Sequence, residues 1–136
     1  MFSWLGKLRG RKGPAPLTGA PAVRRQKTYS AQSGYVYQYV FEGRRDAAGD
    51  PSTEFVFATC ADRKSWHPIS VLVEQPAVRA WEARHRALSS TEWYALAKMA
   101  LFAAFDERGT PAELRGAPVR VREADIEGII ELLGIG

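Results

Sequence analysis

The chain has 136 residues, of which 46% are hydrophobic and 25% charged, and these values are typical of a soluble globular protein. Its formal net charge of +4 arises within residues 1–28, which hold seven basic and no acidic side chains, whereas residues 29–136 contain 12 Lys and Arg against 15 Asp and Glu. A globular nucleic-acid-binding domain is therefore not expected, because such a domain carries its cations on its folded surface. The seven basic residues are Lys7, Arg9, Arg11, Lys12, Arg24, Arg25 and Lys27.

Cysteine content and hydropathy indicate the compartment. Cys60 is the only cysteine, so no intrachain disulfide bond can form. No stretch approaches the roughly 18 apolar residues of a membrane span, and the N-terminus lacks the apolar region of a secretory signal. We therefore expect a cytoplasmic protein.

Residues 1–28 have the composition of a flexible tail that is independent of the fold, and residues 29–136 that of a single domain. Gly or Pro interrupts the tail at seven positions, and no hydrophobic periodicity is sustained. Apolar residues among the cations suit peripheral contact with an anionic membrane, or with nucleic acid, and a solvated tail without a ligand is the alternative. These apolar residues are Phe2, Trp4, Leu5 and Leu8.

Three strands are predicted in the first half of the domain. Residues 35–42 alternate between aromatic and other side chains, and residues 54–60 place phenylalanines on one face and small apolar residues on the other. A turn-rich loop separates them, and a third strand is predicted at residues 69–73. The simplest arrangement is a three-stranded antiparallel meander.

Both faces of the first two strands are apolar, so both require a cover. The face with Val56, Ala58 and Cys60 is small and smooth, and we expect the helices to pack on it. The aromatic face is then either core beneath another part of the chain or a binding surface. It comprises Tyr35, Tyr37, Tyr39, Phe41, Phe55 and Phe57.

Three helices and a fourth, short strand are predicted in the second half. An amphipathic helix begins near Pro76, and a capping box at residues 89–92 opens an apolar helix in which Lys98 is the only charge between residues 93 and 105. A short edge strand at residues 118–122 precedes a helix at residues 123–133, with Gly134 as its C-cap. The order β-β-β-α-α-β-α indicates an α+β fold with the helices mainly on one face of the sheet.

Catalytic and metal motifs are sparse. The sequence has no phosphate-binding glycine loop, dinucleotide fingerprint or paired-cysteine zinc spacing, and no cofactor or metal is expected. Cys60, Asp62 and His67 lie close together around one connection and are the best candidates for nucleophilic catalysis. A buried, inert thiol is the alternative interpretation of Cys60, and we favour it.

Three functions remain open. The favoured one is a non-enzymatic interaction module that binds another protein or forms a homodimer, through the aromatic face or the exposed side of the apolar helix. The second is single-stranded nucleic-acid binding, with the aromatic face as a stacking platform and basic residues as phosphate contacts. The third is a small enzyme centred on Cys60 and His67. Further candidate contact residues in loops are Arg44, Arg45, Arg63, Lys64, Trp66 and His67.

Overall fold

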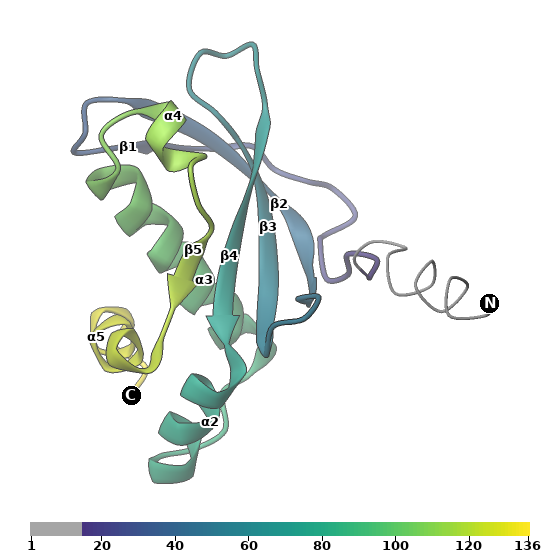
Figure 1. The fold of residues 1–136 in the computed structure, drawn as a ribbon, viewed down its shortest axis with the longest axis vertical. Coiled ribbons are helices and arrows are strands. Elements are labelled where there is room, and N and C mark those ends of the chain that lie inside the picture. Colours follow the sequence, from purple (N-terminus) through teal and green to yellow (C-terminus); the bar gives the residue numbers. More distant parts are fainter. Residues whose placement is uncertain (1–14) are drawn as a thin grey trace, which may run out of the picture.

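The structure is a computed structural model that describes residues 15–136. In this range five strands form one curled sheet with the order β1-β2-β3-β4-β5 (Figure 1). Strands β1 to β4 pair antiparallel, whereas β5 pairs parallel with β4. The strands are β1 (Lys27–Ser30), β2 (Val36–Asp46), β3 (Ser52–Cys60), β4 (His67–Glu74) and β5 (Val119–Val121).

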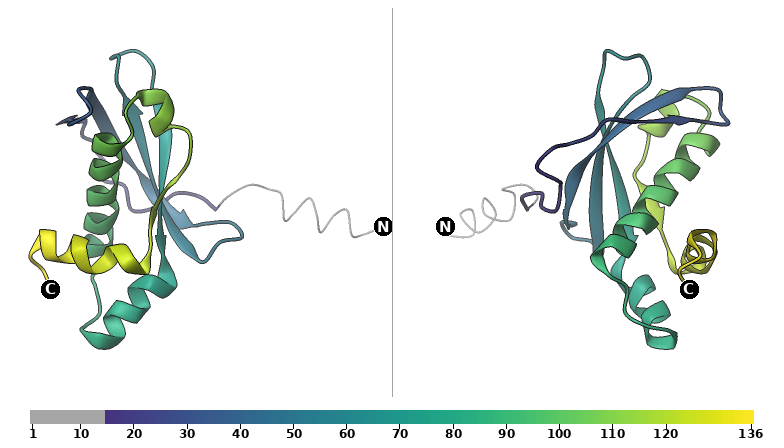
Figure 2. Two further views of the ribbon diagram at one scale, coloured as in Figure 1. Left: turned by 60° about the vertical axis from the view of Figure 1, so that its left-hand side comes forward. Right: turned by 180° about the vertical axis from the view of Figure 1, so that it is seen from behind.

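Four helices follow β4 within the described residues. Figure 2 shows α3 running alongside the sheet, while α2 and α5 lie near the end at which β4 leaves it. The long connection through α2, α3 and α4 brings the chain back, so that β5 enters the sheet parallel to β4. The helices are α2 (Gln75–Arg84), α3 (Ser90–Glu107), α4 (Pro111–Leu114) and α5 (Glu123–Leu133).

The α+β class is confirmed, but the predicted numbers of strands and helices differ from those of the structure. Strand β1 was missed because its four residues show no apolar alternation, and α4 was missed because it is a single turn. The helix ends were predictable from local chemistry. The Ser89 hydroxyl accepts a hydrogen bond from the Glu92 amide, and Gly134 adopts a left-handed C-cap conformation at φ 68°.

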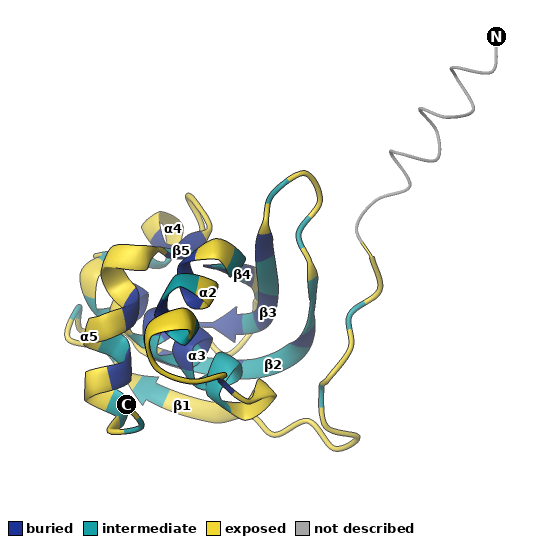
Figure 3. Ribbon diagram, turned by 90° about the horizontal axis from the view of Figure 1, so that it is seen from below, coloured by how far each residue is buried: buried dark blue, intermediate teal, exposed yellow. Residues whose placement is uncertain are grey.

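The helices pack on the aromatic face of the sheet, so the prediction that they cover the Val56 face was wrong. The ring of Phe105 on α3 stacks on that of Tyr37, with 4.3 Å between ring centroids. Figure 3 shows the buried residues gathered on β3, β4 and the inner side of α3. The aromatic face provides more apolar area than the small residues opposite, and apolar area determines which face is buried most favourably.

The opposite face of the sheet carries a network of charged side chains. Arg45 pairs with Glu54 at 2.9 Å, and Glu54 also accepts a hydrogen bond from the Ser70 hydroxyl. Arg120 pairs with Asp50 at 2.6 Å and with Glu74 at 3.4 Å in the same region. These pairs satisfy the polar groups of a sheet face that none of the helices within residues 15–136 covers (Figure 2).

The described part of the predicted tail contacts the sheet. Thr18 and Arg44 exchange two backbone hydrogen bonds of 2.9 and 2.7 Å, and Arg24 pairs with Glu42 at 3.2 Å. The predicted domain boundary after residue 28 divides β1. Residues 1–14, with the predicted membrane-contact segment and Lys7, Arg9, Arg11 and Lys12, lie outside the described residues.

Candidate anion-binding pocket

One stripe of α3 faces strand β1. Tyr94, Lys98, Phe102 and Asp106 recur every four residues and therefore share one side of the helix. Tyr29 on β1 stacks on Phe102 with 4.3 Å between ring centroids, and its hydroxyl donates a hydrogen bond of 2.7 Å to Asp106. These contacts fix β1 against the C-terminal half of α3.

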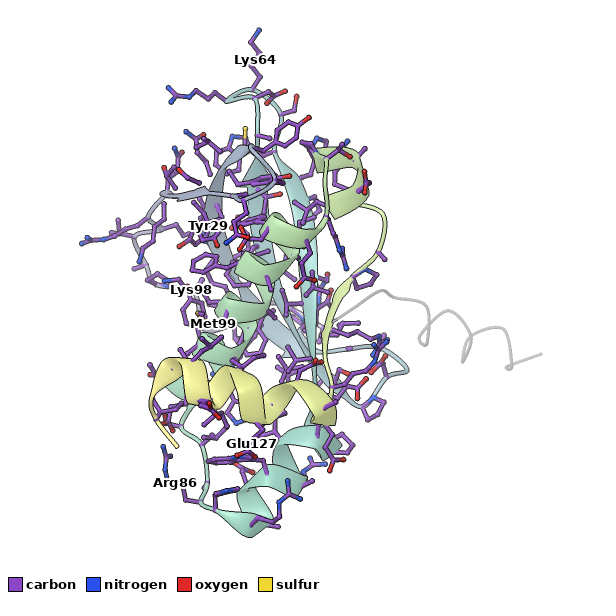
Figure 4. All side chains as sticks on the ribbon, turned by 90° about the vertical axis from the view of Figure 1, so that its left-hand side faces the viewer. Tyr29, Lys64, Arg86, Lys98, Met99 and Glu127 are labelled. Atoms are coloured by element: carbon purple, nitrogen blue, oxygen red, sulfur yellow. The ribbon has the colours of Figure 1, made fainter. Side chains whose placement is uncertain are left out.

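The next inward-facing residue of β1 is a lysine. Lys27 pairs with Tyr39 and lies two residues before Tyr29, so its side chain is on the same side of the sheet as that of Tyr29. On α3, the ammonium nitrogen of Lys98 lies 5.7 Å from the centroid of the Phe102 ring, and the charge of Lys27 contributes to lowering the pKa of Lys98. In Figure 4, Tyr29 and Lys98 lie along the same edge of α3. Lys27 on β1 and Lys98 on α3 therefore both lie beside the contact between Tyr29 and Phe102.

A cavity of about 230 Å³ opens beside Lys27, between the N-terminal segment, β2 and α3. We call it the β1–α3 pocket. Phe41 and Tyr94 meet edge to face at its wall, with 4.8 Å between ring centroids. The pocket is lined by Pro21, Val23, Arg25 and Lys27 from the N-terminal segment, by Tyr39 and Phe41 from β2 and by Tyr94 from α3.

The electrostatics of the pocket favour an anion. Among the described residues, Arg25, Lys27 and Lys98 form no ion pair with a carboxylate, whereas the neighbouring Arg24 does. Burial, and secondarily the charge of Lys27, lowers the pKa of Lys98. Two positive charges held close together repel each other, and a bound anion relieves that repulsion.

The two tyrosines of the pocket supply hydrogen-bond donors. Burial, and secondarily the nearby Tyr94, raises the pKa of the Tyr39 hydroxyl, and burial also raises that of Tyr94. Both phenols are therefore protonated at neutral pH and can donate to an anionic oxygen. The rings offer apolar walls to the rest of a ligand.

The structure separates the predicted aromatic binding face from solvent. Tyr37, Tyr39, Phe55 and Phe57 are buried beneath α3, so they form no exposed stacking platform and no surface for a homodimer. Phe41 is half-buried and Tyr35 is 39% exposed. Of this face, only Tyr39 and Phe41 line the β1–α3 pocket.

The predicted contact loop lies apart from the pocket, at the far end of the β3–β4 connection. Arg63, Lys64 and Trp66 are exposed, and Figure 4 shows Lys64 at the end of the molecule. The Asp62 carboxylate accepts backbone hydrogen bonds from Ser65 and Lys64, each 2.8 Å long. These bonds lower the pKa of Asp62 to about 2 and hold the loop in its turn.

Cys60 and His67 are not arranged as a nucleophile and its base. The thiol of Cys60 is buried and donates to the Asp62 carboxylate at 3.4 Å. Between residues 15 and 136 no hydrogen bond joins Cys60 to the His67 ring, and no group of three metal-binding side chains is close enough to hold an ion.

Two of the pocket's features had signals in the sequence. Lys98 is the only charge in the apolar part of α3, and Tyr39 and Phe41 belong to the alternating aromatic segment. The role of Lys27 was missed because residue 27 was assigned to the tail. Its position depends on the register between β1 and β2, for which so short a strand gives no pattern.

Comparison with protein-family models, with curated protein sequences and with solved structures found no match to this chain. Within residues 15–136, no helix has both the length and the apolar character needed to cross a membrane.

Proposed function

We propose that the protein is a non-enzymatic binding protein that takes a small organic anion in the β1–α3 pocket. The observation that carries this proposal is a cavity lined by Arg25 and Lys27, with Lys98 one helical turn from the lining residue Tyr94, and no ion pair between these cations and a described carboxylate. Other described cations without an acidic partner, such as Lys64 and Arg115, are exposed, whereas Lys98 is half-buried, where a charge without a partner costs more free energy. A ligand that neutralises the two lysines would replace the missing partner.

The pocket favours an anion with an aromatic or apolar part. Lys27 and Arg25 provide charge at its wall, and the hydroxyls of Tyr39 and Tyr94 provide neutral donors. The ring of Phe41 offers an apolar surface. A cavity with apolar walls and a few polar groups is the usual form of a small-molecule site.

Calorimetric titration with phenyl phosphate tests this proposal. We expect saturable binding that is weakened at least about tenfold, or about 1.4 kcal/mol, in the double variant Lys27→Gln, Lys98→Gln. Lys64→Gln removes one positive charge from the distant loop and serves as the matched control. Benzylamine has a similar ring with the opposite charge and should not bind.

Two results would contradict the proposal. One is the absence of saturable binding of phenyl phosphate by a folded protein. The other is an equal loss of affinity in Lys64→Gln and in the double variant, which would indicate attraction by overall charge instead of by the pocket. Circular dichroism melting of each variant shows whether its fold is retained.

A further inference from the structure

The outer wall of the β1–α3 pocket is unusually apolar for an exposed segment. Val23 lines the pocket and is 73% exposed, and Pro21 beside it is exposed as well. Among the large hydrophobic residues described, only Leu132 on α5 is more exposed, at 75%. The mouth of a cationic pocket is thus bordered by apolar side chains that contact water.

Two cations accompany the apolar residues of this rim. Arg25 and Lys27 lie on the same segment as Val23 and line the pocket. The sequence before this segment adds four cations and no acidic residue within residues 1–14. Cations next to exposed apolar side chains are the composition of protein segments that lie on anionic membranes, where the apolar groups enter the interface and the cations meet the headgroups.

From this juxtaposition we propose that the anion held in the pocket is the phosphate monoester headgroup of a lipid, with Pro21 and Val23 against the membrane surface. This inference rests on the proposed anion-binding function and names its ligand class. The ammonium group of Lys27 would face the phosphate, with Lys98 one helical turn from the lining residue Tyr94, and the tyrosine hydroxyls would donate to its oxygens.

The described residues favour a lipid over a nucleic acid. Proteins that bind single strands stack the bases on exposed aromatic rings. The rings at this pocket form no open surface on which successive bases could stack, because Tyr39 is 4% exposed and Phe41 packs against Tyr94. The rim instead presents an aliphatic side chain, Val23, which suits the acyl region of a membrane.

Vesicle co-sedimentation of the full chain tests the inference. Phosphatidylcholine vesicles containing phosphatidic acid present the phosphate monoester, and vesicles matched in surface charge with phosphatidylglycerol present a diester. We expect at least severalfold stronger partitioning onto the phosphatidic acid vesicles. The double variant Lys27→Gln, Lys98→Gln should lose this preference, and Lys64→Gln should retain it.

A substitution at the rim separates lipid binding from binding of the free anion. Val23→Ser removes an exposed apolar side chain without adding charge, and it should lower partitioning onto phosphatidic acid vesicles by a larger factor than it lowers the affinity for phenyl phosphate. Leu132→Ser makes the same kind of change at an equally exposed position away from the pocket. It should leave both measurements unchanged.

Each alternative result has a definite meaning. If phenyl phosphate binds but the vesicles do not, or if both vesicle types bind equally and Val23→Ser has no effect, the lipid inference is wrong and the proposed function stands. If neither probe binds, both fail. Displacement of the protein from vesicles by a single-stranded oligonucleotide, with the same dependence on Lys27 and Lys98, would identify a nucleic acid as the ligand and overturn the inference.

Discussion

At the scale of single residues, Glu92 links two structural elements. Its carboxylate accepts hydrogen bonds of 3.0 and 2.8 Å from the Arg86 guanidinium and one of 2.8 Å from the Ser89 amide. The Arg86 hydrogen bonds, followed by that of Ser89, lower the pKa of Glu92 from its ordinary 4.5 to about 2. Folding therefore favours the ionised form of the Glu92 carboxylate.

We predict that Glu92→Gln reduces the loss of stability in acid. The lowered pKa means that Glu92 contributes its full stabilisation above pH 4.5 and loses it as the pH falls toward 2. Urea unfolding at pH 7 and at pH 3 measures this effect. The decrease in unfolding free energy between the two pH values should be larger in the natural chain than in the variant. Equal decreases would show that Glu92 is not coupled to folding.

A second prediction at this scale concerns Cys60. The residue is 2% exposed, and its thiol is hydrogen-bonded to Asp62, so a thiol reagent should react slowly with the native protein and rapidly in urea. Cys60→Ala should bind phenyl phosphate as the natural chain does. Rapid modification of the native protein together with loss of binding would instead indicate a functional thiol.

At the scale of elements, Arg108 secures the connection from α3 to β5. Its guanidinium donates hydrogen bonds of 2.9, 2.6 and 3.1 Å to the carbonyl oxygens of Leu114, Ala117 and Pro118. One side chain thus satisfies three backbone acceptors along residues 114–118. It positions the chain to enter the sheet as β5, which is short and has few other constraints.

We predict that Arg108→Met destabilises the protein by about 2 kcal/mol, because hydrogen bonds from a charged donor are each worth roughly 1.5–3 kcal/mol and these are partly exposed. Arg115→Met is the matched control, since the exposed Arg115 donates no side-chain hydrogen bond to a described residue. Urea unfolding measures the difference. Equal stabilities of the two variants would contradict the role of Arg108.

The elements also show what the sequence could predict. Strand β2, strand β3 and helix α3 were located because alternation and capping are local patterns. Local patterns could not predict which face of the sheet the helices cover, since both faces of the strands are apolar and α3 is apolar around most of its circumference. Packing of Tyr37 and Tyr29 on α3 determines which face is core and where β1 lies.

The same limit applies to the pocket. Lys98 was conspicuous as a lone charge, and Tyr39 and Phe41 belonged to a face that was predicted to be either core or a binding surface. The structure makes the two rings walls of a cavity. The pocket also requires Lys27 and Val23, which the predicted domain boundary had placed in the tail. That boundary was drawn from composition, and composition does not show that a segment rich in Gly and Pro follows the edge of a sheet.

At the scale of the whole molecule, the N-terminal segment joins the fold to its candidate site. Residues 15–30 contact β2 through the Thr18–Arg44 bridge, the Arg24–Glu42 pair and strand β1. Arg45 also donates to the Ala15 carbonyl at 3.3 Å. The segment therefore contributes both to stability and to the wall of the β1–α3 pocket.

Two truncations should separate these contributions. Removal of residues 1–14 keeps every contact described above, so we expect an unchanged melting temperature and retained binding of phenyl phosphate. Removal of residues 1–27 eliminates the Thr18 and Arg24 contacts and the first residue of β1. We expect the melting temperature to fall by roughly 5–10 °C, since a loss of about 1 kcal/mol in unfolding free energy lowers it by some 4–8 °C in a domain of this size. Because it also removes Arg25 and Lys27, this truncation should abolish phenyl phosphate binding even well below its melting temperature. Identical melting and binding of the two truncated chains would show that residues 15–27 are dispensable, and would place any anion site elsewhere.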